Sequence, residues 1–393
     1  MTDGTGARPV SLFLILSFVG GAAIFSSTIA KNPVLPLLAQ SLGADPAAIG
    51  LIAAASTVTG IATSLLAGRL SDRFGRRPLL LFSGIVFATA PFLYLFVTSP
   101  TELALVRAYH GLATAVFGPV ASAYITDVAP VRRGERLGYF SSAQLAGRAI
   151  APAIGGALIA VGSWEWVYLA SAVAGVGVLA GMWPLREPGP TGGEDGSTET
   201  GMEKGGVATP TILATSIAEA GQYFAFGAIE AFLPLYALSI GVAPTIIGLL
   251  FAAQVGIRTV SRPLFGRLSD ARGRRRPILT GLLLSAGATA LLPFATDWEG
   301  LLTLSAVFGV GLSVAQAATQ AFVADVAPER GRGTALGVMS TIMDIGQAAG
   351  PVAVGLLVAA GSYTAGFVGA ALVVLGATAV FGIVVRSETV PAS

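Results

Sequence analysis

The sequence of 393 residues contains no cysteine and only one histidine, and these absences exclude several kinds of site. Without cysteine there can be no disulfide, no thiolate metal site and no cysteine nucleophile. The phosphate-binding pattern Gly-x-x-x-x-Gly-Lys-Ser/Thr does not occur either, so we expect no use of ATP. No catalytic constellation is recognisable. We therefore predict neither an enzyme nor a site for a metal or a cofactor.

Charged residues are scarce, because they make up 11% of the chain against 54% hydrophobic residues. Soluble domains carry about 25% charged residues. A chain with so few charges cannot cover a water-facing surface of this size, and its excess apolar surface needs lipid as a solvent. The composition therefore predicts a protein embedded in a lipid bilayer, and we expect no nucleic-acid partner.

Twelve apolar segments are long enough to cross a bilayer, whose apolar core is about 30 Å thick and takes about 20 helical residues. Backbone groups in lipid must bond within their own segment, so each segment is predicted to be a helix. The first segment is longer than the apolar part of a signal peptide, about 7–15 residues, and we expect it to be retained. The segments are 10–38, 46–69, 78–98, 101–126, 135–160, 165–185, 210–238, 244–268, 277–296, 299–324, 333–360 and 363–385. The predicted fold class is an all-α membrane protein with twelve transmembrane helices.

The connections between segments differ in charge on the two sides of the predicted membrane. Those that join an odd-numbered segment to the next even-numbered one are short, and hold acidic but no basic residues. The other connections contain the arginine clusters, for example at 69–77 and 132–136. Cytoplasmic loops carry an excess of Lys and Arg. We therefore expect a cytoplasmic (inner) membrane protein with both termini and the arginine clusters in the cytoplasm.

One arginine-rich turn occurs twice in the chain. Residues 68–77 are Gly-Arg-Leu-Ser-Asp-Arg-Phe-Gly-Arg-Arg, and residues 266–275 are Gly-Arg-Leu-Ser-Asp-Ala-Arg-Gly-Arg-Arg, 198 positions later. Asp127-Val-Ala-Pro recurs with the same offset at 325–328. Parallel repeats of six helices are typical of transporters that alternate access between the two sides of a membrane.

The duplication predicts two pseudo-symmetric six-helix bundles, residues 1–185 and 210–393. The segment between them, 186–209, is rich in glycine, threonine and acid and has almost nothing to bury. Such a composition is typical of a flexible linker, and we expect it on the cytoplasmic side.

The duplicated turn resembles the best-known motif of the major facilitator superfamily, and the resemblance extends over about residues 10–385. Arg107 and Gly111 in the fourth segment are similar to a second motif of that family. The fifth segment is similar to the motif of its proton-coupled antiporters, with Ala151 where glycine is usual; the matching residues are Gly138, Gly147, Pro152, Gly155 and Gly156. The resemblance implies a secondary transporter that exports a small amphipathic compound in exchange for protons.

The two turns are predicted to form a conformational latch. Asp72 lies four residues before Arg76, and Asp127 ends the fourth segment on the same side, so the three charges can join three helices. The resemblance implies that Asp72 also faces the start of the eleventh helix, since helix N-termini attract negative charge. The alternative is that these charges only anchor loops to headgroups. The latch residues are Gly68, Asp72, Arg76 and Asp127 in the first half and Gly266, Asp270, Arg274 and Asp325 in the second.

Charged residues inside the predicted helices form the candidate site. Each costs about 2.5–3.5 kcal/mol at the centre of a bilayer, so we expect them to face a cavity or one another. Glu219 and Glu230 lie eleven residues apart on one helical stripe, with Tyr223 and Phe226 between them. The predicted proton-coupling or substrate-binding residues are Lys31, Arg107, Arg148, Glu219, Tyr223, Phe226, Glu230 and Asp344. The alternative is that these charges form static ion pairs.

The fifth segment carries a stripe of small residues, Gly147, Ala151 and Gly155, at intervals of four. Such stripes let helices approach closely in lipid, and here close packing can seal the contact between the two halves. For Glu230, a position near the outer rim is an alternative to one in the cavity.

Several alternatives to proton-coupled drug export remain open from the sequence. The arginines of the first half would suit a sugar or organic anion as a specific metabolite, in either direction of transport. A lipid-type substrate and a membrane sensor that does not transport are the others. The expected partners are a small-molecule substrate, protons and the lipid bilayer, and the expected oligomeric state is a monomer.

Overall fold

The computed structural model describes residues 9–128, 133–188 and 209–386, and these residues are helical almost throughout. The first half contains α1 (Pro9–Ile29), α2 (Val34–Ser41), α3 (Pro46–Phe74), α4 (Arg76–Leu93), α5 (Pro100–Val128), α6 (Arg133–Val161) and α7 (Trp164–Met182). The second half contains α8 (Pro210–Ser239), α9 (Pro244–Arg272), α10 (Arg275–Leu291), α11 (Trp298–Val326), α12 (Arg332–Ala360) and α13 (Tyr363–Val384). Short 3₁₀ turns follow α4 and α10 and precede α12, at Tyr94–Phe96, Leu292–Phe294 and Glu329–Gly331.

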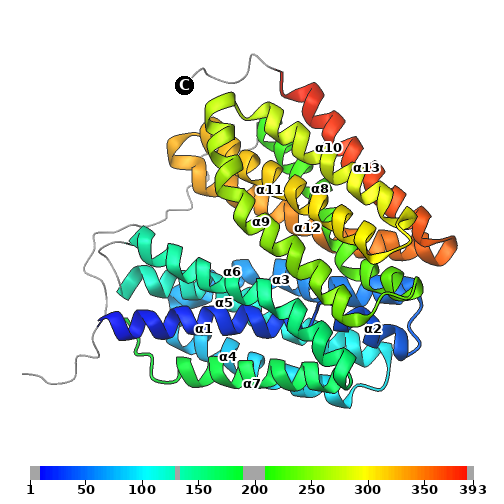
Figure 1. The fold of residues 1–393 in the computed structure, drawn as a ribbon. Helices are drawn as coiled ribbons and strands as arrows, with labels where there is room; N and C mark the ends of the chain where they lie inside the picture. Colours follow the sequence, from blue (N-terminus) through cyan, green and yellow to red (C-terminus); the bar gives the residue numbers. More distant parts are fainter. Residues whose placement is uncertain (1–8, 129–132, 189–208, 387–393) are drawn as a thin grey trace, which may run out of the picture.

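The helices form two bundles that correspond to the two halves of the chain (Figure 1). Within the first bundle, α3 packs on α5 and α1 on α6; within the second, α9 packs on α11 and α8 on α12. The bundles touch each other mainly where α3 meets α12 and where α6 meets α9. These are equivalent helices of the two repeats, as the duplicated sequence requires. The linker proposed for 186–209 falls mostly on residues 189–208, which lie outside the described residues.

The first predicted segment, 10–38, is not one continuous helix. The chain leaves helical geometry at residues 30–33 and resumes it in α2. Pro33 stands at the break, and a proline lacks the backbone donor that a helix interior needs. The prediction of an unbroken helix was therefore wrong at this point. The break leaves Lys31 and Asn32 between the two bundles.

Eleven stretches of the described residues are long and apolar enough to cross a membrane, and α1 and α2 together form one of them. Of the twelve predicted segments, α8 alone is not in this set. It has 30 residues but contains Glu219, Gln222 and Glu230. Most of its side chains are buried, and it packs against α12, α13 and α11. α8 is therefore shielded from lipid by its neighbours, which explains why it can be more polar.

The bundles are in close contact at the end of the molecule that carries the short acidic connections, here called the short-loop end. A Cβ atom at Gly50 of α3 would overlap the carbonyl oxygen of Pro351 in α12. A Cβ at Gly248 of α9 would likewise overlap the carbonyl oxygen of Pro152 in α6. The two contacts are equivalent under the internal repeat. They close the short-loop end, whereas the opposite end, here called the basic end, carries the two arginine-rich turns.

Candidate functional site

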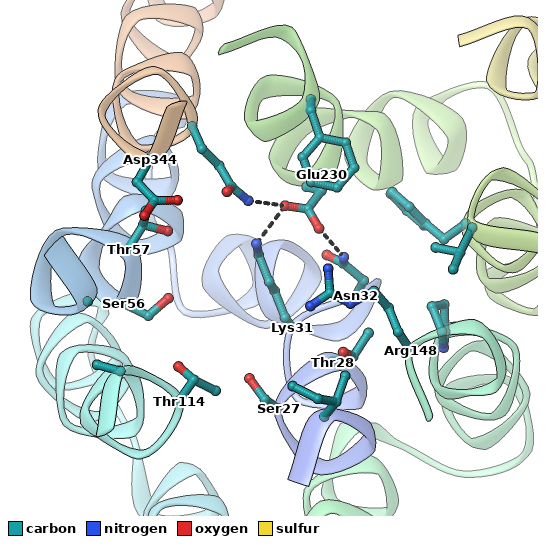
Figure 2. Close-up of a pocket in the computed structure, with 18 of the residues that line it drawn as sticks. Ser27, Thr28, Lys31, Asn32, Ser56, Thr57, Thr114, Arg148, Glu230 and Asp344 are labelled. Carbon is teal, nitrogen blue, oxygen red and sulfur yellow. Dashed lines mark hydrogen bonds and ion pairs between the residues drawn. The ribbon is translucent and has the colours of Figure 1, made fainter. Parts of the chain in front are cut away.

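A cavity of about 430 Å³ lies between the bundles, and Figure 2 shows the side chains around it. Its wall is formed by α1, the α1–α2 break, α3, α5 and α6 from the first half and by α8, α9 and α12 from the second. Lys31 and Glu230 lie on its wall toward the short-loop end, while Ser64 and Pro119 lie further toward the basic end. The predicted site residues on the wall are Lys31, Arg107, Arg148, Phe226, Glu230 and Asp344.

An ion pair joins the two bundles at the wall of this cavity. Lys31 Nζ lies 2.6 Å from Glu230 Oε2, and Asn32 Nδ2 donates to Glu230 Oε1 at 2.8 Å. Gln347 Nε2 of α12 also donates to Oε2, at 3.4 Å. Glu230 is 9% exposed and lies on the cavity wall toward the short-loop end. Asn32 and Gln347 are not among the predicted site residues, although the Asn-Pro pair inside an apolar run is a signal for the first of them.

Glu219 and Tyr223 do not line the cavity, although the sequence placed them on one cavity-facing stripe with Glu230. That prediction was wrong for this part of α8, because α11 packs over it. Glu219 is fully buried; its Oε2 accepts a 2.5 Å hydrogen bond from Thr319 Oγ1, and its Oε1 has no hydrogen-bond partner in the protein.

Arg258 of α9 connects this buried region to the cavity. It lines the cavity wall, and its Nη2 donates to the hydroxyl of Tyr223 at 2.7 Å and to Gln316 Oε1 at 2.6 Å. Its guanidinium also lies about 6 Å from the ring centres of Tyr223 and Phe226, within the range of cation–π attraction. Arg258 is thus a residue through which Glu219 and the cavity can influence each other.

The two arginine-rich turns have the same internal geometry. In the first, Arg76 Nε lies 3.0 Å from Asp127 Oδ2, and Arg76 Nη1 lies 2.5 Å from Asp72 Oδ1. In the second, Arg274 pairs with Asp325 and Asp270 through the same atoms. Both central arginines also bond a serine, Ser71 or Ser269. Each turn therefore joins three helices of one bundle.

The carboxylates of Asp72 and Asp270 are largely exposed, at 70% and 65%. A Cβ atom at Gly68 or Gly266 would meet nothing within 4 Å. A contact between Asp72 and the start of α12 belongs to a state in which the basic end is shut, so the cross-bundle part of the latch stays a prediction.

Comparison with known proteins decides the family. The model of the Major Facilitator Superfamily matches residues 16–218 and again residues 215–393. The chain belongs to the major facilitator superfamily. The resemblance found in the sequence is thereby confirmed, and the protein is a multi-pass secondary transporter and not an enzyme.

Relatives and solved structures agree with this assignment. Multidrug resistance protein 1 of Bacillus subtilis is 26% identical over 330 residues, which cover 83% of this chain and 84% of the relative. Quinolone resistance protein NorA of Staphylococcus aureus is 26% identical over 348 residues, with 83% and 84% covered. The crystal structure of a bacterial homolog of the human lysosomal transporter Spinster, described as inward-facing and unoccupied, has a TM-score of 0.82 at 18% identity. It covers 97% of this chain and 98% of that chain, and it supports the fold.

The small-residue stripe of this transporter's α6 is divided between two neighbours. Gly147 packs against the backbone of Gly21 in α1, and Gly155 lies against Asn32 at the α1–α2 break. Gly156, with Pro152, faces α9 of the other bundle, while a Cβ atom at Gly138 would meet nothing within 4 Å. Gly147 and Gly155 thus pack within one bundle, and the contact between bundles depends on the next face of the helix.

Glu187 falls within the predicted linker, 186–209, but contacts the first bundle. Its two carboxylate oxygens accept hydrogen bonds from the backbone N–H groups of Arg76, at 2.6 Å, and Arg77, at 2.8 Å. An acid at a helix N-terminus satisfies free donors and is attracted by the helix dipole. Glu187 therefore ties the chain after α7 to the first arginine-rich turn.

Replacing Asp72 by asparagine is expected to hold the transporter open at the basic end. The amide removes the charge that a cross-bundle contact with the N-terminus of α12 would need. A single cysteine at Ser64, a cavity residue toward the basic end, can be labelled selectively because the chain has no other cysteine. Faster labelling of Ser64→Cys in the Asp72→Asn background is the expected result, and Glu299→Gln, at an exposed acid of the short-loop end, serves as a control for loss of an acid elsewhere. Unchanged labelling would show that Asp72 does not hold the basic end shut.

Proposed function

We propose that this protein exports a small amphipathic compound in exchange for protons, by alternating access, with the arginine-rich turns and both termini in the cytoplasm. Two relatives whose names record multidrug and quinolone resistance support an export role. The excess of arginine at the basic end supports the orientation. With that orientation, the closed short-loop end faces outward and the cavity is reached from the cytoplasm. This is the state in which a substrate for export is loaded.

The observation that carries the proton-coupled part of the proposal is the environment of Glu219. Its carboxyl group is fully buried, has no ion pair within the described residues, and leaves one oxygen without a hydrogen bond. A carboxylate in an apolar region must be paired, neutralised or hydrated. We propose that Glu219 carries a proton in this state and releases it when α9 moves and brings Arg258 to it. Asp344, which lies on the cavity wall, is the second candidate carrier.

Substituting Glu219 by glutamine, or Asp344 by asparagine, is expected to abolish substrate accumulation driven by a pH gradient. Downhill exchange of substrate should persist, because the amide keeps the shape of the side chain and one acceptor oxygen. Both modes are measured for each variant in the same proteoliposomes. Glu299→Gln, at an exposed acid in the first turn of α11, is the matched control. If both single variants and the double variant still accumulate substrate, these acids are structural and the proton is carried elsewhere.

One alternative substrate class, a lipid-type compound, has a structural feature in its favour. An apolar groove of about 780 Å³ lies between α3 and α12, lined by residues such as Val58, Ala349 and Leu356. Ile61 lines both this groove and the central cavity. A lipid-type substrate would need such an apolar route beside the cavity. The same proteoliposome assay with a lipid-type substrate distinguishes this alternative.

A further inference from the structure

The charges on the cavity wall are distributed unevenly between the bundles. The first bundle contributes Lys31, Arg107 and Arg148 and no acid. The second contributes Arg258 with the two acids, Glu230 and Asp344. Within the part of the chain that the structure describes, the wall therefore carries four cationic and two acidic side chains, and the surplus is positive.

The ion pair at the closed end does not remove this surplus. Glu230 pairs with Lys31 and accepts further hydrogen bonds from Asn32 and Gln347, so its single negative charge is matched by the charge of that ammonium. Asp344 lies on the α12 side of the cavity beside Thr57, with the Lys31–Glu230 pair between it and Arg148 in Figure 2. The arginines thus have only Asp344 as a further counter-charge on the wall.

Arg148 and Arg107 are the two guanidinium groups that the first bundle places on the cavity wall, and among the described residues no carboxylate forms an ion pair with either. Arg148 projects from α6 into the open cavity (Figure 2). Arg107 is only 3% exposed, and its Nε has no hydrogen-bond partner in the protein. An arginine near the middle of a membrane costs about 2.5–3.5 kcal/mol even on lenient scales. Two such groups beside one cavity create a positive potential that attracts an anion.

Around these arginines the wall offers the other groups that a small amphipathic anion needs. The hydroxyl groups of Ser27, Thr28 and Thr114 lie on the wall of the same cavity and can donate further hydrogen bonds. Ile24 and Phe251 supply apolar surface on the same wall. A guanidinium presents parallel N–H donors that match the two oxygens of a carboxylate.

We propose that the substrate is an amphipathic anion whose carboxylate-like group binds Arg148 and Arg107, while its apolar body contacts the aliphatic and aromatic wall. The inference names the substrate class for the transport function proposed above and rests on that function. It distinguishes this transporter from an exporter of amphipathic cations, for which a wall with surplus positive charge is unfavourable. Asp344 repels the anionic group, so removing its charge strengthens binding.

The test uses three naphthalene compounds with the same apolar ring and different head groups: 2-naphthoate, 2-naphthylmethanol and 2-naphthylmethylammonium. Their dissociation constants are measured on the full-length protein in lipid nanodiscs by titration calorimetry, at one pH and without a gradient. The wild-type protein is expected to bind the anion at least about tenfold more tightly than the cation, a ratio that corresponds to about 1.4 kcal/mol. The affinity for the anion should also fall as salt is added.

Variants assign the effect to residues. Arg148→Gln is expected to weaken the binding of 2-naphthoate by about tenfold and to leave the affinity for the neutral alcohol unchanged. The unchanged affinity for the alcohol also shows that the variant is folded. Asp344→Asn should increase the affinity for 2-naphthoate. Misfolding cannot cause an increase in affinity. The proposal is overturned if the cation binds as tightly as the anion, if the wild-type protein binds no anion, or if Arg148→Gln leaves anion affinity unchanged.

The outcome is separable from that of the transport proposal. Binding is measured at equilibrium, so it does not depend on proton coupling. Anion binding with no accumulation driven by a pH gradient would refute the proton-exchange function and leave the substrate class standing. If the protein prefers the cation but accumulates substrate in a way that depends on Glu219, the substrate class is refuted and the proton-exchange function stands.

Discussion

Replacing Glu230 by glutamine is expected to stop transport and to open the short-loop end of the molecule. The carboxylate holds Lys31 at 2.6 Å and Asn32 at 2.8 Å, and both donors belong to the other bundle. Glutamine keeps the shape but leaves the mostly buried Lys31 ammonium without a counter-ion between the bundles. Removing one partner of a buried ion pair costs about 3–5 kcal/mol. Because this pair joins the bundles, that cost falls on the conformation in which they meet.

A loss of about 3 kcal/mol corresponds to roughly a hundredfold shift in a conformational equilibrium. Cysteine labelling measures the shift. Ala47 lies against Gly355 where α3 meets α12, so Ala47→Cys reports opening at the short-loop end. We expect faster labelling in Glu230→Gln than in the wild-type background, together with loss of transport in proteoliposomes.

Two further variants show whether the pair itself is responsible. The double variant Lys31→Met with Glu230→Gln should destabilise the closed conformation by less than the sum of the two single changes. The effects of substitutions at residues in contact are not additive. The exchanged pair, Lys31→Glu with Glu230→Lys, should recover part of the closed population. If Glu230→Gln is labelled at the same rate as the wild-type protein and still transports, this ion pair does not hold the short-loop end shut.

Gly248→Ala is expected to reduce transport at least about tenfold by a steric effect. The added methyl group would overlap the carbonyl oxygen of Pro152 and lie 3.0 Å from the Cα atom of Gly156, and both are backbone atoms. A backbone cannot rotate away as a side chain can, so α6 and α9 have to separate. Overpacking of a well-packed contact costs about 1–3 kcal/mol, and here the cost is confined to the state in which the bundles touch.

The matched control is Gly256→Ala on the same helix, where a Cβ atom would meet nothing within 4 Å. Alanine in an unobstructed helix position is favoured over glycine by about 0.5–1 kcal/mol, so this variant should fold and transport normally. Gly50→Ala, which meets Pro351 in the equivalent contact of α3 and α12, should behave like Gly248→Ala. Equal activity of Gly248→Ala and Gly256→Ala would mean that the α6–α9 contact tolerates separation during transport.

The sequence by itself determined the features that depend on short stretches of chain. Hydropathy over about 20 residues is enough to place a membrane span, and the duplication identified the paired turns. The clusters of Asp72 with Arg76 and of Asp270 with Arg274 follow from a four-residue spacing at the end of a helix. Even the exception, the broken first segment, has a local cause in Pro33.

Only the tertiary structure decided which distant residues meet. Lys31 and Glu230 are 199 positions apart, and their contact depends on how two bundles are placed against each other. The tilt and rotation of α8 put Glu230 in the cavity but Glu219 behind Arg258 and α11, although one helical stripe contains both acids. Glu187 binds the start of α4 because the chain after α7 returns there. Helical periodicity defines the faces of a helix, but the neighbour that covers each face depends on the packing of the whole bundle.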